Sequence, residues 1–298
     1  MKYDNLIKRL HFRENMGGTP ALLKVYMEAA DLNDVAVNFV IGVYDLVGLW
    51  APKRGYKDTV DRNITPRPVA HAHTFSELLF FYGYGADGLD NLGARINLSL
   101  GKEYEQHIIT EPSLVVAPPH LPHCPLYTEE CKRPYAHMHI ALSIDHGLAG
   151  ATTMVEQDGS TDGTKYAHLI KKFSQAPKPE GAEAGFFFTG DDLEGTPLTV
   201  AMGMYSREGS WYPGKGALVN PYNKLLVFFG NNAENPNDLG AEVAVCLGEE
   251  REEHLLTEAS VVVVPPNLPH LPVICRKIKK PYYALQVEFS ARPEVTWL

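Results

Sequence analysis

Short runs in which hydrophobic and polar residues alternate cover most of this chain, and glycine or proline separates one run from the next. Alternation with a period of two is typical of β-strands that turn one face toward a core. The 22 prolines and 25 glycines are scattered over the 298 residues, as in proteins with many tight turns. We therefore expect an all-β protein with an antiparallel barrel or jelly-roll architecture. In its first half the expected strands are 35–44, 72–82, 95–100, 105–110, 113–117 and 135–142.

The chain contains two copies of one sequence pattern. Residues 92–123 match residues 239–270 without a gap, and residues 41–55 match residues 202–216. A repeat of this length is too long for a solenoid unit, so it predicts two sibling domains packed on each other.

The duplication divides the chain into an N-terminal domain, residues 1–145, and a C-terminal domain, residues 166–298. The linker, residues 146–165, is small, polar and rich in glycine, and we expect a flexible or loosely packed connection. Each copy opens on a segment whose hydrophobic spacing predicts a short amphipathic helix. The apolar residues of these two segments are Leu6, Ile7 and Leu10, and Leu169, Ile170 and Phe173.

Composition narrows the class of protein. With 45% hydrophobic and 21% charged residues, the chain has the balance of a soluble globular protein. It has no apolar run of membrane-spanning length, and its first residues lack the features of a secretory signal. The four cysteines show no CxxC spacing, which favours reduced thiols and a cytoplasmic location. The net charge of −9 disfavours a nucleic-acid partner.

The segment HAHTFSELLFFYG, residues 71–83, concentrates residues capable of binding a metal. On one continuous strand His71, His73 and Glu77 would point to the same face, because alternate side chains share a face. The apolar residues of the same parity are Phe75, Leu79 and Phe81. A further histidine, His123, follows the proline-rich sequence PPHLP. Imidazole nitrogens and carboxylate oxygens suit a first-row divalent metal.

Two motifs resemble those of the cupin superfamily. The first is His71-x-His73 followed by Glu77 and a nearby glycine, and the second is Pro118-x-His120-x-x-His123, with His120 in place of the usual glycine. Because both copies are covered, the chain resembles the bicupins. The resemblance implies two tandem cupin-type double-stranded β-helix (jelly-roll) barrels with short flanking helices. It also implies that one divalent transition metal (Fe, Mn, Ni or Zn) is bound in the N-terminal barrel by His71, His73, Glu77 and His123.

The second copy departs from the metal-binding pattern. The residues in register with the first three expected ligands are Leu218, Asn220 and Lys224. Only His270 remains, opposite His123. Because a lone histidine near a lysine is a poor site for a divalent metal, we expect the C-terminal barrel to lack a complete site. It would be structural, or would form a wall of the binding cleft.

The remaining histidines have structural interpretations. His107 and His254 occur at matched positions in both copies, which favours a structural role. His137 and His139 occur only in the first copy. On their strand, Met138 and the alternate residues in line with it are apolar and would face the core. We therefore expect the side chains of His137 and His139 to point away from the core.

Other residues near the motifs also have ordinary interpretations. We expect Cys124 to be a small buried hydrophobe and Arg95 to be an exposed strand residue, and His120 is a weaker candidate for a contact with a metal ligand. The acidic hairpin of the first copy, with Glu103 and Glu105, is repeated in the second and is expected to be solvated. Trp50 and Trp211 occupy matched positions and are expected to pack in the shared scaffold.

The expected metal centre is compatible with several functions. Aromatic neighbours such as Phe80 and Phe81 favour a dioxygenase-type oxidoreductase that acts on a small aromatic or carboxylate compound, an expectation drawn by analogy. A metal-dependent isomerase, lyase or decarboxylase, a non-catalytic binding or sensor protein, and a zinc-stabilised barrel are the alternatives. No serine–histidine–acid triad, phosphate loop or dinucleotide motif competes with the site. The expected partners are a small-molecule substrate and a second copy in a homodimer, with no nucleic acid and no membrane.

Overall fold

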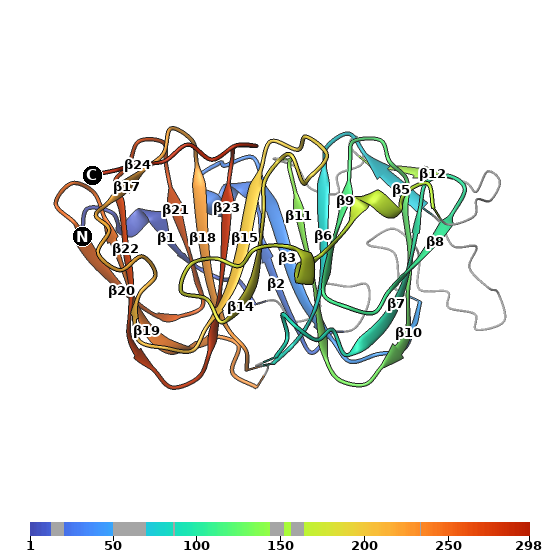
Figure 1. Ribbon diagram of the computed structural model, residues 1–298, viewed down its shortest axis with the longest axis horizontal. Coiled ribbons are helices and arrows are strands. Elements are labelled where there is room, and N and C mark those ends of the chain that lie inside the picture. The colour runs from blue at the N-terminus through green and yellow to red at the C-terminus, as the bar shows by residue number, and fades with distance from the viewer. Residues whose placement is uncertain (13–20, 50–69, 86, 144–151, 156–163, 233) are drawn as a thin grey trace.

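Two β-barrels lie side by side in the computed structural model, which describes residues 1–12, 21–49, 70–85, 87–143, 152–155, 164–232 and 234–298 (Figure 1). Each barrel consists of two six-stranded antiparallel sheets that pack face to face. We call the sheet that faces the other barrel the inner sheet and its partner the outer sheet. The expected all-β fold with two tandem jelly-roll barrels is confirmed.

The N-terminal barrel has an inner sheet with the order β13-β9-β6-β11-β3-β2, and an outer sheet with the order β12-β5-β10-β7-β8, in which β4 also pairs with β10. The inner strands are β2 (Leu23–Met27), β3 (Asn38–Tyr44), β6 (Glu77–Gly83), β9 (Ser113–Ala117), β11 (Tyr135–Ala141) and β13 (Ile170–Lys172). The outer strands are β4 (Gly48–Leu49), β5 (Ala70–His73), β7 (Ala94–Leu100), β8 (Glu105–Ile109), β10 (His123–Cys131) and β12 (Thr152–Val155).

The C-terminal barrel repeats this arrangement, with the inner order β1-β21-β18-β23-β15-β14 and the outer order β20-β19-β22-β17-β24, to which β16 adds through β22. Its inner strands are β1 (Ile7–Arg9), β14 (Ala184–Phe188), β15 (Thr199–Tyr205), β18 (Lys224–Gly230), β21 (Ser260–Val264) and β23 (Tyr282–Glu288). Its outer strands are β16 (Gly209–Ser210), β17 (Leu218–Val219), β19 (Asp238–Leu247), β20 (Glu252–Glu258), β22 (His270–Ile278) and β24 (Thr296–Trp297).

Each inner sheet receives one edge strand from the other copy. β1, at the start of the chain, pairs with β21 of the C-terminal barrel, and Ile7 lies opposite Val262. β13, at the start of the second copy, pairs with β9 of the N-terminal barrel, and Ile170 lies opposite Val115. The opening segment of each copy therefore completes the sheet of its sibling.

These opening segments are not the amphipathic helices expected from their hydrophobic spacing. Each is a single 3-10 turn followed by a strand: η1 (Asp4–Leu6) precedes β1, and η3 (Ala167–Leu169) precedes β13. The other helical pieces among the described residues are the 3-10 turns η2 (Ala29–Leu32) and η4 (Phe173–Gln175). The exposed edge of the sibling's sheet offers backbone partners to the segment, and this pairing prevails over a helical pattern too short to stabilise itself.

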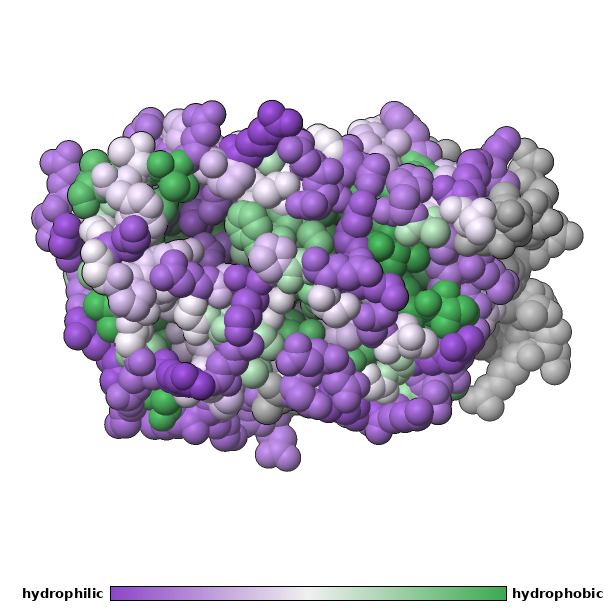
Figure 2. Space-filling model, in the orientation of Figure 1, coloured by the Kyte–Doolittle hydropathy of each residue, from purple (hydrophilic) through white to green (hydrophobic). Residues whose placement is uncertain are grey.

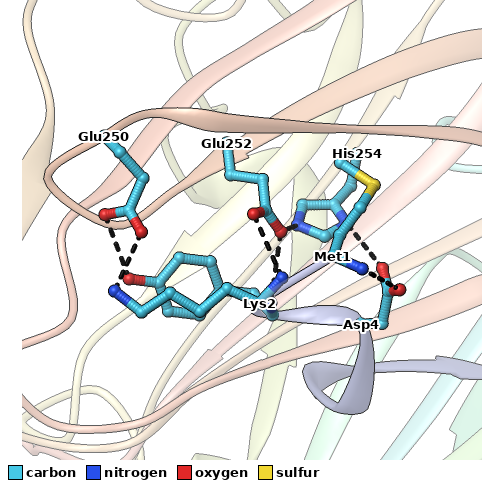
Figure 3. Close-up of polar contacts among 7 residues, drawn as sticks. Met1, Lys2, Asp4, Glu250, Glu252 and His254 are labelled. Atoms are coloured by element: carbon cyan, nitrogen blue, oxygen red, sulfur yellow. Dashed lines mark hydrogen bonds and ion pairs between the residues drawn. The ribbon is translucent and has the colours of Figure 1, made fainter.

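A glutamate on the sibling barrel holds each opening segment. Glu105, at the start of β8, accepts hydrogen bonds from the backbone N–H groups of Tyr166 (2.8 Å) and Lys165 (3.3 Å). Glu252, at the matched position, accepts those of Tyr3 (3.2 Å) and Lys2 (3.1 Å), as Figure 3 shows for Lys2. The expectation that Glu105 lies on a solvated face is wrong, because its side chain is buried beneath the segment that it binds.

The two inner sheets enclose a hydrophobic core that belongs to both barrels. Phe80 of β6 stacks on Phe186 of β14, with ring centroids 5.7 Å apart, and Phe173 lies 4.1 Å from the same ring. Met138 and Ile140 of β11 also belong to this shared core. The opposite face of each inner sheet lines a separate core inside its own barrel. The central strands of each inner sheet, such as β6 and β11, are therefore covered on both faces, which explains their nearly continuous hydrophobic sequences.

Several strand boundaries differ from the expected ones. The expected strand 72–82 is two strands, β5 and β6, which a bend separates. The strand β10 was not expected, because its sequence HCPLYTEEC contains a proline and few alternating apolar residues. The expected loose linker contains β12, which pairs with β5, so part of it is integrated in the N-terminal barrel.

The face of the molecule shown in Figure 2 is mostly polar, with apolar side chains interspersed. Trp211 packs as expected of a scaffold residue: it stacks on Tyr205 and donates a hydrogen bond from Nε1 to the Tyr282 hydroxyl (3.1 Å). Trp50 lies outside the described residues.

Within the described part of the chain, no helix has the length and apolar character needed to cross a membrane.

Candidate metal centre

The four expected ligands come from three strands of the N-terminal barrel. His71 and His73 lie on β5, His123 is the first residue of β10, and Glu77 is the first residue of β6. β5 and β10 are neighbours in the outer sheet, where His123 pairs with His71. β6 belongs to the inner sheet, so Glu77 approaches from the opposite wall of the barrel.

The expectation that a single strand carries His71, His73 and Glu77 on one face is therefore wrong, although the three side chains do converge. The two histidines do share a face of β5, because alternate residues point the same way. Glu77 begins a different strand in a different sheet. It reaches the same point because the two sheets pack face to face across the barrel interior.

The donor atoms of these four side chains converge. One ligand atom from each residue lies within 4.8 Å of all the others. Glu77 Oε2 is 3.1 Å from His123 Nε2 and 3.4 Å from His73 Nε2. Two donors that share a first-row ion at about 2.1 Å are separated by about 3 to 4 Å. The observed distances match such an ion after small side-chain adjustments.

The hydrogen bonding of His123 orients one nitrogen toward this point. Its Nδ1 lies 3.1 Å from the carbonyl oxygen of Leu121, which can only accept, so Nδ1 carries a proton and donates it. Its Nε2 faces the carboxylate of Glu77 at 3.1 Å. A divalent cation between the two groups would take Nε2 and the carboxylate oxygen as ligands.

A second side of the carboxylate is held by a histidine that the sequence analysis placed elsewhere. His139 Nδ1 lies 2.8 Å from Glu77 Oε1. The expectation that His137 and His139 point away from the core holds only for the core shared by the two barrels. Both rings point into the N-terminal barrel, where His137 stacks on Phe81 at a centroid distance of 4.5 Å.

Sequence analysis contained a signal for His139. The equivalent positions in the second copy are Ala284 and Gln286, so this histidine pair exists only in the copy that also has the expected ligands. The strand β11 has two buried faces. Met138 and Ile140 point into the core shared by the barrels, so the residues that alternate with them can still be buried inside the N-terminal barrel.

The centre has apolar surroundings and one more accessible side. The ring of Phe75 stacks on His73 with centroids 4.7 Å apart. Leu79 and Phe81, which follow Glu77 on the inward face of β6, are buried. Three of the four candidate ligands are buried and His71 is only partly buried. Among the four candidate ligands, His71 is therefore the most accessible to solvent.

The other residues considered near the two motifs do not join the four converging side chains. The side chain of His120 is exposed, and its backbone N–H donates to the His73 carbonyl (2.7 Å), which ties the loop to β5. Cys124 is partly buried and does not belong to the group of converging donors. Arg95 is exposed and paired with Glu129 at 2.7 Å, as expected of a strand arginine. His107 is buried against Glu105 (2.9 Å), in agreement with a structural role.

The donor set fits a divalent transition metal. Three imidazoles and one carboxylate satisfy the preference of such ions for nitrogen and oxygen ligands, and they leave coordination positions for water or substrate. The N-terminal barrel encloses no buried lysine or arginine among its described residues that would compete for Glu77.

The C-terminal barrel has the same framework without the donors. Leu218 pairs with His270 on the outer sheet, as His71 pairs with His123. Lys224, at the position of Glu77, is buried and forms an ion pair with Glu288 (2.9 Å). Burial and the nearby Lys224 ammonium lower the pKa of His270 to about 3, so its imidazole is neutral. Leu218, Lys224 and the neutral His270 therefore cannot replace the metal-binding side chains of the first barrel.

A second group of possible donors, Asp4, Glu252 and His254, lies where the opening segment meets β20 (Figure 3). Glu252 already accepts two backbone hydrogen bonds, and His254 Nε2 lies 2.9 Å from it. Asp4 is exposed and contacts the Met1 amino group at 2.7 Å. These contacts indicate that the three residues hold the opening segment against β20 rather than bind a metal.

Comparison with known proteins gives the fold family of the barrels. No family model matches the sequence, and no curated protein matches it either. The structure is similar to oxalate decarboxylase from Bacillus subtilis, with a TM-score of 0.59 and 10% identity over 98% of this chain and 78% of that chain. It is also similar to the coconut allergen cocosin, with a TM-score of 0.59 and 9% identity over 97% of this chain and 87% of that one.

Both structural neighbours are bicupins, and the likeness extends over nearly the whole chain. The cupin-type fold expected from the two motifs is thus confirmed. At identities near 10% the likeness concerns the fold alone.

Proposed function

We propose that this protein, which has the two-barrel cupin fold, is a metal-dependent enzyme that acts on a small organic molecule in its N-terminal barrel. One observation carries the proposal: His71, His73, Glu77 and His123 bring four donor atoms within 4.8 Å of one another. The fold alone hosts many activities, so the argument rests on the site.

The side chains around the centre would each have a defined task. A bound divalent ion would supply Lewis acidity to an oxygen atom of the substrate. His139 would keep the carboxylate of Glu77 oriented toward the ion through its 2.8 Å contact. Phe75, Leu79 and Phe81 would exclude water from the substrate and would pack against its apolar part.

The charge of the barrel interior limits the substrate class. Among the described residues of the N-terminal barrel, every lysine and arginine is at least partly exposed. Within that described part of the barrel, a substrate with two carboxylates would find no buried side-chain cation to pair with. The described wall therefore supports a neutral or singly charged chelating substrate, such as a diol or an aromatic acid, in a dioxygenase-type reaction.

A second candidate is decarboxylation or another reaction without net oxidation. It is favoured by the structural likeness to oxalate decarboxylase over 98% of the chain. Oxygen consumption separates the two candidates, because only a dioxygenase incorporates both oxygen atoms into its product. Oxygen-electrode assays against catechols, keto acids and hydroxy acids, with carbon dioxide release measured in parallel, would assign the class.

A matched pair of variants tests the centre itself. His123→Asn should abolish stoichiometric binding of a divalent metal and with it any turnover, whereas His270→Asn, at the same position of the other barrel, should leave the metal content unchanged. Elemental analysis of protein purified without oxygen gives the metal content, and far-UV circular dichroism checks the fold. Equal metal content in the two variants would contradict the proposal, as would firmly bound metal without turnover of any compound tested.

A further inference from the structure

The C-terminal barrel has a cavity of about 300 Å³ at its mouth. Residues 177–180 border it, and its wall is formed by Phe187, Thr199, Ala201, Tyr212, Gln286 and Glu288. Strands β14, β15 and β23 contribute most of these residues, on the face opposite to the core shared by the barrels. The cavity therefore opens into the interior of the C-terminal barrel.

This cavity lies beside the position that corresponds to the metal centre of the first barrel, and the counterparts of the four candidate ligands are not part of its wall. Gln286 lies opposite Leu226 on β18, as His139 lies opposite Leu79 on β6. Glu288 lies opposite Lys224, as Ala141 lies opposite Glu77. In the second barrel a Lys224–Glu288 ion pair therefore stands at the position that Glu77 has in the first barrel.

The charges around the cavity balance. Glu288 uses one oxygen for Lys224 (2.9 Å) and accepts a hydrogen bond from the Tyr222 hydroxyl (2.9 Å) with the other. At the border, Lys178 and Glu180 carry opposite charges. A charged ligand would have to disturb a buried ion pair, which is costly, so the pocket favours a neutral ligand.

The polar groups of the cavity favour a ligand with several hydroxyl groups. The Gln286 amide, which also contacts the Tyr212 hydroxyl, has both donor and acceptor atoms, and each carboxylate oxygen of Glu288 can accept one more hydrogen bond. The rings of Phe187 and Tyr212 offer apolar faces.

We propose that the C-terminal barrel binds a neutral polyhydroxylated molecule no larger than a monosaccharide, through the side chains of Gln286, Glu288, Phe187 and Tyr212. The size follows from the cavity, which lies at the lower end of the roughly 300 to 1,000 Å³ typical of ligand pockets. The binding mode combines hydroxyl hydrogen bonds to the amide and the carboxylate with packing of C–H groups on the rings. This site is separate from the metal centre and does not depend on the function proposed for it.

Isothermal titration calorimetry of the full chain tests this site. The probes are hexoses, pentoses and cyclic polyols, with oxalate and phosphate as charged comparators, and each is titrated into the unmodified chain and into His123→Asn, in which the metal centre of the first barrel is disabled. At least one neutral polyol should bind to His123→Asn, and the two anions should not. Gln286→Leu, which keeps the volume and removes both polar atoms, should weaken that binding about tenfold or more. Phe187→Ala should weaken it as well, through loss of ring packing.

Leu255→Ser is the matched control, because Leu255 is exposed on β20 of the same barrel, away from the cavity wall. It should leave polyol binding unchanged. The proposal is overturned if no neutral polyol binds to the folded protein, if an anion binds in preference, or if Gln286→Leu binds as tightly as the unmodified chain. Metal content measured on each variant keeps this test apart from the metal centre.

Discussion

One histidine position has different chemistry in the two barrels. His123 directs Nε2 to a carboxylate at 3.1 Å, whereas the imidazole of His270 lies near the ammonium group of Lys224. Both residues use Nδ1 in the same way, each at 3.1 Å from the carbonyl oxygen two residues earlier. The turn thus explains why a histidine is present in both copies, and the residue on the opposite wall decides what its second nitrogen can do.

The neutral state of His270 makes stability depend on pH. Its pKa is lowered from 6.5 to about 3 in the folded protein, first by burial and then by Lys224. Between these values the unfolded chain binds a proton that the folded chain does not, so the free energy of unfolding decreases as the pH falls below 6.5.

His270→Asn keeps a donor for the Leu268 carbonyl and removes this titration. Between about pH 7.5 and about pH 4.5, the free energy of unfolding of the unmodified protein should decrease by roughly 3 kcal/mol more than that of the variant. Urea denaturation of metal-free protein at both pH values measures the difference. Parallel decreases in the two proteins would show that His270 is protonated in the folded state.

His139 is expected to act on the metal through Glu77. Its Nδ1 lies 2.8 Å from Glu77 Oε1, so His139→Leu removes the group that orients the carboxylate. The variant should bind divalent metal roughly 10- to 100-fold more weakly without loss of fold. His139→Asn, whose amide can occupy the position of Nδ1, should restore part of the affinity. Competition with a chromophoric chelator gives the affinities, and equal affinity in all three proteins would refute the role.

At the scale of secondary-structure elements, the exchange of β1 and β13 depends on two glutamates. Glu105 is 2% exposed and accepts two backbone hydrogen bonds from the segment that begins the second copy. Glu105→Ala leaves these N–H groups without their acceptor and should lower the free energy of unfolding by roughly 1 to 3 kcal/mol.

Gln106→Ala, one residue further on the exposed face of β8, should change stability little. Guanidinium denaturation followed by circular dichroism compares the two variants. If both destabilise the protein equally, the hydrogen bonds of Glu105 do not hold the segment.

The elements also show which parts of the structure a sequence can predict. The duplicated sequence pattern and the alternation of hydrophobic and polar residues were sufficient to predict the two barrels. They also predicted strands such as β9, whose expected bounds are the observed ones. The break between β5 and β6 could not be predicted from alternation, because the bend at Thr74 and Phe75 keeps the parity of the residues on either side. The pairing of β1 and β13 with the sibling barrel is a long-range contact that no local pattern encodes.

The same reasoning applies to the site residues. The convergence of His71, His73 and Glu77 was expected, but the physical cause is the packing of two sheets rather than one strand face. His139 was missed because a strand covered on both faces has no solvent side, so parity cannot exclude an interior position. The pocket of the C-terminal barrel is formed by three strands and two loops, and only the fold brings them together.

At the scale of the whole molecule, the shared core couples the unfolding of one barrel to that of the other. Phe186 of the C-terminal barrel is buried against Phe80 of the N-terminal barrel and against Phe173. Phe186→Ala should cost roughly 3 to 5 kcal/mol, because the cavity has walls from both barrels.

The loss should appear in both barrels at one midpoint. Metal release reports on the N-terminal barrel and the fluorescence of Trp211 and Trp297 on the C-terminal barrel, in a background where Trp50→Phe removes the remaining tryptophan. Separate midpoints for the two signals would show that the barrels unfold independently. The homodimer expected from the sequence stays a prediction, which analytical ultracentrifugation of the full chain would test.

Strand exchange also has a consequence for synthesis of the chain. β1 is synthesised before the other described strands, but its partner β21 (Ser260–Val264) follows most of them in the sequence. The nascent N-terminal barrel must in turn wait for β13 (Ile170–Lys172) before its sheet is complete. During this interval an unpaired strand edge is exposed on the emerging polypeptide, and this is the stage at which a chaperone would protect it from aggregation.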